Sequence, residues 1–75
     1  MPRIGEALGI LFYVNAEDHN PPHVHAIYGS EQAQLEIATG ALLAGSLPGN
    51  KLRQAQEWLG SNRDLAQAAW DRLNP

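Results

Sequence analysis

The chain has 75 residues, which is the length of one small domain. It carries 5 Lys and Arg residues against 8 Asp and Glu residues, a formal net charge of −3, so a broad basic face for coating nucleic acid is not expected. Apolar residues make up 44% of the chain, as in globular proteins, and the absence of cysteine excludes disulfides and thiolate zinc sites.

No segment has the pattern of a targeting signal or a membrane span. The longest apolar run, Ile10 to Val14, is five residues long, whereas a membrane helix needs about 20. The first ten residues lack the basic and apolar regions of a signal peptide. We therefore expect a cytoplasmic protein without a membrane segment. Because so small a domain has a marginal core, a protein partner or a homodimer would add useful burial.

Residues 1–47 have the composition of a β-meander, and residues 48–75 that of helices. Residues 10–14 are β-branched and aromatic, which is typical of a buried strand. Residues 15–22 contain two prolines and turn-forming polar residues, which predict a loop. Extended segments are expected at residues 10–14, 23–28, 31–38 and 41–44, and residues 3–4 can add an edge strand.

The dipeptide Gly29-Ser30 suits a two-residue hairpin turn, because glycine comes first. Such a turn places His23 opposite Glu36 and His25 opposite Gln34. Both imidazoles then lie on one face of the sheet, since residues two apart on a strand point the same way.

A second two-residue turn is expected at Thr39-Gly40, which places Ile37 opposite Leu42 and Leu35 opposite Ala44. The two turns sort the same residues to each side of the sheet. The expected apolar face is Val24, Ala26, Tyr28, Ala33, Leu35, Ile37, Leu42 and Ala44. The expected opposite face is His23, His25, Ile27, Gln32, Gln34, Glu36 and Leu43.

Residues 48–75 predict two helices. Pro48 suits a first helical turn, Gly60 suits the end of the first helix, and Ser61 or Asn62 can cap the second, with Asp64 in its first turn. The apolar stripes are Leu52, Ala55, Trp58 and Leu59, then Leu65, Ala66, Ala69, Trp70 and Leu73. The expected fold class is α+β: an antiparallel sheet of three to four strands followed by a C-terminal helical hairpin packed on one face.

All three histidines, His19, His23 and His25, lie within seven residues. Two or three imidazoles with a carboxylate form a ligand set for zinc or another divalent metal, so these three are candidate metal ligands. The same groups suit acid–base chemistry, because imidazole titrates near neutrality and a carboxylate can fix its tautomer. Candidate catalytic residues are therefore His23, His25 and Glu36.

Other interpretations of the histidine cluster stay open. Histidines near a proline turn often fasten a loop by hydrogen bonds, and an alternating pair on a strand can be a half-exposed surface pair. The cluster can also contact a protein partner or nucleic acid, although the net charge does not favour nucleic acid. The spacing alone does not separate these roles.

The block from His19 to Tyr28 reads HNPPHVHAIY and resembles the hallmark of a bacterial family of small proteins, the domain of unknown function numbered 4160. The lead into the proline pair, Glu17-Asp18-His19-Asn20, departs from the Glu-His-x-Pro type usual in that family. Other similar segments are the opening MPRI, GILFY at residues 9–13, the GxLxxGxLP pattern at residues 40–48, and Glu57-Trp58.

The resemblance implies a cytoplasmic bacterial protein that works with a protein partner, because genes of this family often lie beside a second small gene, as in toxin–antitoxin pairs. One hypothesis is thus a protein-interaction component of such a two-gene module, with the histidine cluster as its working surface. The alternative is a histidine-based hydrolase or ribonuclease, metal-dependent or metal-free, acting on RNA or nucleotides.

Overall fold

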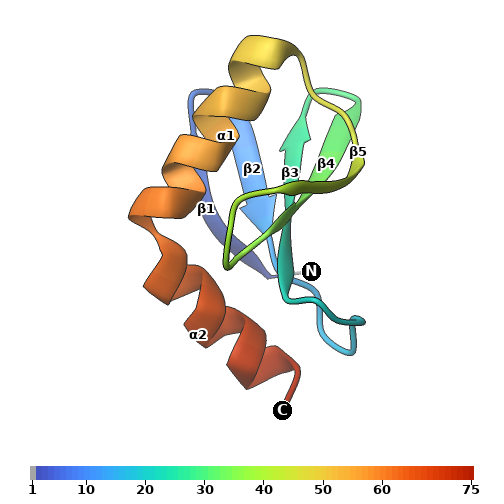
Figure 1. The fold of residues 1–75 in the computed structure, drawn as a ribbon, viewed down its shortest axis with the longest axis vertical. Helices are drawn as coiled ribbons and strands as arrows, with labels where there is room; N and C mark the ends of the chain where they lie inside the picture. The colour runs from blue at the N-terminus through green and yellow to red at the C-terminus, as the bar shows by residue number, and fades with distance from the viewer. Residues whose placement is uncertain (1) are drawn as a thin grey trace.

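The computed structural model describes residues 2–75, which form a sheet followed by two helices (Figure 1). Its strands are antiparallel and neighbour one another in chain order. The α+β class is confirmed, with five strands in place of three or four, because the segment expected at residues 3–4 extends to a full strand. The elements are β1 (Arg3–Ala7), β2 (Ile10–Tyr13), β3 (His23–Tyr28), β4 (Glu31–Glu36), β5 (Leu42–Gly45), α1 (Gly49–Ser61) and α2 (Arg63–Leu73).

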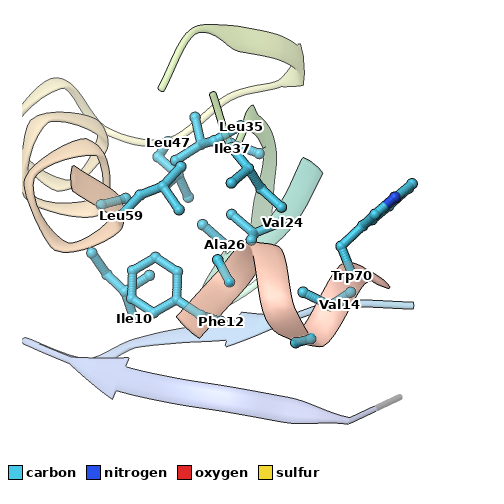
Figure 2. Packing of buried hydrophobic residues seen from close by; sticks show 14 residues of the cluster. Ile10, Phe12, Val14, Val24, Ala26, Leu35, Ile37, Leu47, Leu59 and Trp70 are labelled. Carbon is cyan, nitrogen blue, oxygen red and sulfur yellow. The ribbon is translucent and has the colours of Figure 1, made fainter. Parts of the chain in front are cut away.

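The hydrophobic core lies between one face of the sheet and the two helices (Figure 2). Alternate residues of the strands point into it, and the ring of Trp58 on α1 stacks on that of Phe12 with the centroids 4.0 Å apart. Figure 2 shows the ring of Trp70 pointing away from the rest of the cluster. The buried members are Ile10, Phe12, Val14, Val24, Ala26, Ala33, Leu35, Ile37, Leu47, Ala55, Leu59, Ala66, Ala69 and Trp70.

The pairing expected across Gly29-Ser30 is confirmed. His23 pairs with Glu36, and His25 pairs with Gln34. Gly29 has a φ of 62°, the left-handed conformation that glycine adopts without steric cost. This register fixes the two imidazoles on the sheet face opposite to the core.

The pairing expected across Thr39-Gly40 is wrong. Leu35 pairs with Leu42, and Ala44 pairs with Gln34. Strand β4 ends at Glu36, so the turn contains more than two residues. A bulge also shifts the register of β4 and β5 between Gln34 and Leu35. As a result Leu42 and Ala44 are exposed rather than part of the core.

The helices differ from expectation in three respects. Gly60 does not end the first helix, since α1 runs on to Ser61, where the side chain and backbone N–H groups of Asn62 donate to carbonyls of the last turn. Leu65 is exposed, while Ala66 and Ala69 are buried, because the stripe of α2 that faces the core is narrow. Figure 1 also shows α2 continuing away from the end of α1, so the two helices do not fold back on each other as in the expected hairpin. No helix within residues 2–75 has the length and apolar character to cross a membrane.

Candidate metal centre

The loop between β2 and β3 places a carboxylate against the first residues of β3. It contains a cis bond between Asn20 and Pro21, and the carbonyl of Pro22 accepts a hydrogen bond from the backbone of Ile37 at 3.0 Å. This hydrogen bond holds the end of the loop beside the start of β3, and Asp18 lies over His23 and His25.

Asp18 is the central group of the cluster. Its Oδ2 lies 3.0 Å from Nε2 of His23 and 3.2 Å from Nε2 of His25. Its Oδ1 accepts a hydrogen bond of 2.9 Å from the backbone N–H of His19. The side chains are 14%, 2% and 7% exposed for Asp18, His23 and His25. The carboxylate therefore turns one oxygen to the loop backbone and the other to two buried imidazoles.

The tautomer of His23 is set by the loop. Its Nδ1 donates a hydrogen bond of 2.8 Å to the carbonyl of Pro21. In the neutral ring Nε2 then carries a lone pair. This nitrogen is buried and has no hydrogen-bond partner, although Oδ2 of Asp18 is close to it. When the ring is neutral, two electron-rich atoms, Nε2 of His23 and Oδ2 of Asp18, therefore face one another 3.0 Å apart, and a proton or a metal cation between them would join them.

His25 lies among three polar side chains. Its Nδ1 is 2.9 Å from the amide nitrogen of Gln32. Its Nε2 is 3.2 Å from Oδ2 of Asp18 and 3.1 Å from the amide nitrogen of Asn15. One ring nitrogen cannot donate to a carboxylate and accept from an amide at the same time, so these two contacts are alternatives. Oδ1 of Asn15 is itself buried without a partner.

Burial raises the pKa of Asp18, but other contacts outweigh this effect. The hydrogen bond with His25, the backbone N–H of His19 and the charge on the two neighbouring imidazoles all stabilise the carboxylate. The pKa of Asp18 consequently lies below its ordinary value. The cluster thus contains an ionised carboxylate, which is the form that binds a metal.

The profile of one protein family matches the chain from residue 9 to residue 71. The chain belongs to the family described as Domain of unknown function (DUF4160). This match confirms the resemblance noted from the sequence. Neither a curated protein nor a solved structure matches the chain.

The DUF4160 chain brings together only part of the set expected from its sequence. His23 and His25 converge, whereas the side chain of His19 is 83% exposed and lies with Nδ1 3.2 Å from Oδ1 of Asp18. Glu36 pairs with His23 along the backbone, but its carboxylate accepts a hydrogen bond from the hydroxyl of Thr39. Asp18 supplies the carboxylate beside the imidazoles instead.

Helix α2 supplies contacts to the cluster that the sequence pattern does not indicate. The ring of Trp70 lies against that of His23 with the centroids 5.2 Å apart. The side chain of Asn74 accepts a hydrogen bond from the backbone N–H of Asp18 at 2.7 Å. Trp70 and Asn74 are four residues apart, which is the spacing of neighbours on one helix face. That spacing is the only local signal in the sequence that pairs them.

A cleft of about 450 Å³ opens beside Asp18, between the loop and α2. It gives the carboxylate side of the cluster a path to solvent, while the imidazoles remain buried. Its lining residues are Glu17, Asp18, Asn20, Trp70, Leu73, Asn74 and Pro75.

Proposed function

We propose that this chain binds one divalent transition-metal ion, such as zinc, through Asp18, His23 and His25. The carrying observation is the unpartnered, buried Nε2 of His23, which faces a carboxylate oxygen at 3.0 Å. A buried polar atom without a partner costs about 1–3 kcal/mol, so such atoms call for an explanation. A cation shared by Nε2 and the carboxylate removes this cost.

The spacing of the ligand atoms suits a small cation. Each of the three side chains offers one ligand atom, and these atoms lie within 4.8 Å of one another. Ligands bound to zinc at the usual 2.0–2.1 Å are about 3.3 Å apart in a tetrahedral site. The two separations from Oδ2 of Asp18, 3.0 Å and 3.2 Å, are close to that value. Only the two imidazoles need to approach each other.

Groups next to the two histidines can fix the ring tautomer that a metal ion requires, with the proton on Nδ1 and the lone pair on Nε2. A metal-binding histidine usually donates its other N–H to a carbonyl or carboxylate, which fixes its tautomer. His23 already makes this contact with the Pro21 carbonyl. For His25 the amide of Gln32, turned about its last bond, offers an oxygen to Nδ1–H in place of its nitrogen.

Three protein ligands leave one position of a tetrahedral zinc site for water, as in hydrolytic enzymes. The cleft beside Asp18 provides access for that water and for a substrate. Hydrolysis is therefore the chemistry that the centre supports best once metal is bound, in keeping with a metal-dependent hydrolase.

Metal content and calorimetric zinc titration of the purified, untagged protein test this proposal. We expect one zinc ion per chain with sub-micromolar affinity, lost in Asp18→Asn and in the double variant His23→Ala/His25→Ala. Asp71→Asn, the same change at an exposed site on α2, is the control and should bind as the wild type does. Because Asp18→Asn keeps the side-chain volume, it remains informative if the double variant fails to fold. A wild-type protein that binds no divalent ion would overturn the proposal.

A second candidate function is protein interaction, within a toxin–antitoxin-like pair or a homodimer. The favouring observation is that Leu42 and Leu43 on the edge strand β5 are 43% and 42% exposed. Light scattering of the wild type and of Leu43→Lys tests the homodimer, which should dissociate in the variant. A monomeric wild type would exclude it, and co-purification with the product of the neighbouring gene would then test the partner.

A further inference from the structure

Helix α2 touches two of the three proposed metal ligands. Trp70 lies against the ring of His23, and Asn74, one turn later, bonds the backbone of Asp18. The sheet positions both histidines, but Asp18 lies in the loop between β2 and β3, outside any strand. The place of the carboxylate therefore depends on what holds this loop.

Asn74 makes two hydrogen bonds to that loop from one side chain. Its Oδ1 accepts the backbone N–H of Asp18 at 2.7 Å, and its Nδ2 donates to the carbonyl of Asn15 at 3.0 Å. It also ends α2, since its backbone N–H donates to the carbonyl of Trp70 at 2.7 Å. One residue thus joins the end of α2 to both sides of the segment that carries Asp18.

We propose that Asn74 is a positioning residue that holds Asp18 in the metal centre, so that metal binding and the docking of α2 are coupled. The inference rests on the proposed metal-binding function. The two hydrogen bonds of Asn74 support the coupling, because they hold the backbone at Asn15 and at Asp18, on either side of Glu17. With this backbone fixed, the carboxylate of Asp18 meets both imidazoles at a lower entropic cost at the moment of binding.

The coupling works in both directions, because linkage between two equilibria is reciprocal. If the Asn74 contacts raise metal affinity, bound metal must strengthen the docking of the end of α2 by the same factor. Trp70 is a built-in reporter of this change, since its ring lies 5.2 Å from the ring of His23. Replacing Trp58 by Phe would make it the single tryptophan of the chain.

The experiment compares zinc affinity with the stability of the metal-free protein in matched variants. Asn74→Ala removes both loop contacts, and Asn74→Asp keeps an acceptor for the N–H of Asp18 but loses the donor to Asn15. Asn62→Ala is the control. The side chain of Asn62 donates to the carbonyl of Trp58, as that of Asn74 donates to the carbonyl of Trp70, but it makes no hydrogen bond to the centre. Affinity is measured by zinc titration, and stability by denaturant unfolding in chelator.

We expect zinc affinity to fall about tenfold to a hundredfold in Asn74→Ala, the range for lost supporting contacts around a metal. Asn74→Asp should recover part of that loss, and Asn62→Ala should bind as the wild type does. Zinc should also slow amide exchange in the last turn of α2 in the wild type but not in Asn74→Ala. Equal zinc affinity in the wild type and Asn74→Ala would overturn this inference alone. Failure of the wild type to bind zinc would overturn the metal site and this inference together.

Discussion

At the level of single residues, His23 is unusual because it is a buried polar side chain on the sheet face opposite to the core. Its side chain is 2% exposed, and it touches both an ionised carboxylate and the ring of Trp70. Burying polar groups is costly unless each finds a partner. Nδ1 has one in the Pro21 carbonyl, while Nε2 has none. A metal cation between Nε2 and the carboxylate of Asp18 would give this nitrogen the partner that it lacks.

Gln32 gives a sharp test of the centre, because it touches a ligand without being one. We expect Gln32→Leu to weaken zinc binding about tenfold or more, since the amide no longer orients the ring of His25. Because the variant leaves Nδ1 of the buried His25 without its partner, the metal-free protein should also lose about 1–3 kcal/mol of stability. The measurements are zinc titration and urea unfolding in chelator.

Gln34→Leu is the matched control for this substitution. Gln34 pairs with His25 along the backbone, but its amide is not among the hydrogen-bond partners of that ring. Equal losses of affinity in the two variants would mean that a leucine on this face disturbs the sheet. The amide of Gln32 would then have no role in the centre.

The sequence located the imidazoles of the cluster but not their carboxylate. The strand pattern gave the common face of His23 and His25 and the backbone partner of His23, Glu36. A backbone pair, however, does not fix where a long side chain points, and Glu36 turns to Thr39. Asp18 lies in a loop, whose path follows from tertiary hydrogen bonds that no periodic pattern encodes.

At the scale of elements, strand β1 and helix α1 meet at Gly5. A Cβ at this position would collide with the ring of Trp58, which is itself stacked on Phe12 and cannot easily move. We expect Gly5→Ala to lower the free energy of unfolding by about 1–3 kcal/mol, the usual cost of overpacking. Chemical denaturation in chelator measures this loss.

Gly60→Ala is the control for the glycine substitution. Gly60 lies inside α1, and a Cβ there would meet nothing within 4 Å. Alanine should therefore stabilise the helix by up to about 1 kcal/mol, because it has the higher helix propensity. A Gly5→Ala protein as stable as the wild type would show that Trp58 can move aside and that α1 is loosely packed on β1.

The two hairpin turns show where local patterns suffice for an element. Gly29 and Ser30 predict their turn correctly because the glycine takes the left-handed conformation directly between two strands. Gly40 also has a positive φ, of 79°, but the strand before it has already ended at Glu36. The wider turn and its bulge belong to the irregular pairing of β5 with β4, which the residues of the turn alone did not predict.

At the scale of the whole molecule, the centre is assembled from three parts of the chain. The loop gives Asp18, β3 gives the imidazoles, and α2 gives the contacts of Trp70 and Asn74. Asn74 is 56 residues from Asp18 along the chain, so their contact exists only in the folded protein. Metal binding should therefore be linked to global folding.

This linkage predicts that zinc raises the melting temperature of the wild type. Free zinc at 100 times its dissociation constant should stabilise the native state by about 2.7 kcal/mol. For a chain of this size, a gain of 1 kcal/mol raises the melting temperature by about 4–8 °C, so the expected rise is roughly 10–20 °C. Thermal unfolding with buffered zinc and with chelator measures it.

Asp18→Asn and magnesium separate a specific site from general effects of the ion. The variant lacks the charged ligand, and magnesium prefers oxygen ligands, so neither zinc with Asp18→Asn nor magnesium with the wild type should raise the melting temperature. An equal rise with zinc in the wild type and in Asp18→Asn would place the ion elsewhere, for example at the exposed His19. A rise confined to the wild type with zinc would mean that the ion binds the native centre more tightly than the unfolded chain, because equal binding to both states would leave the melting temperature unchanged.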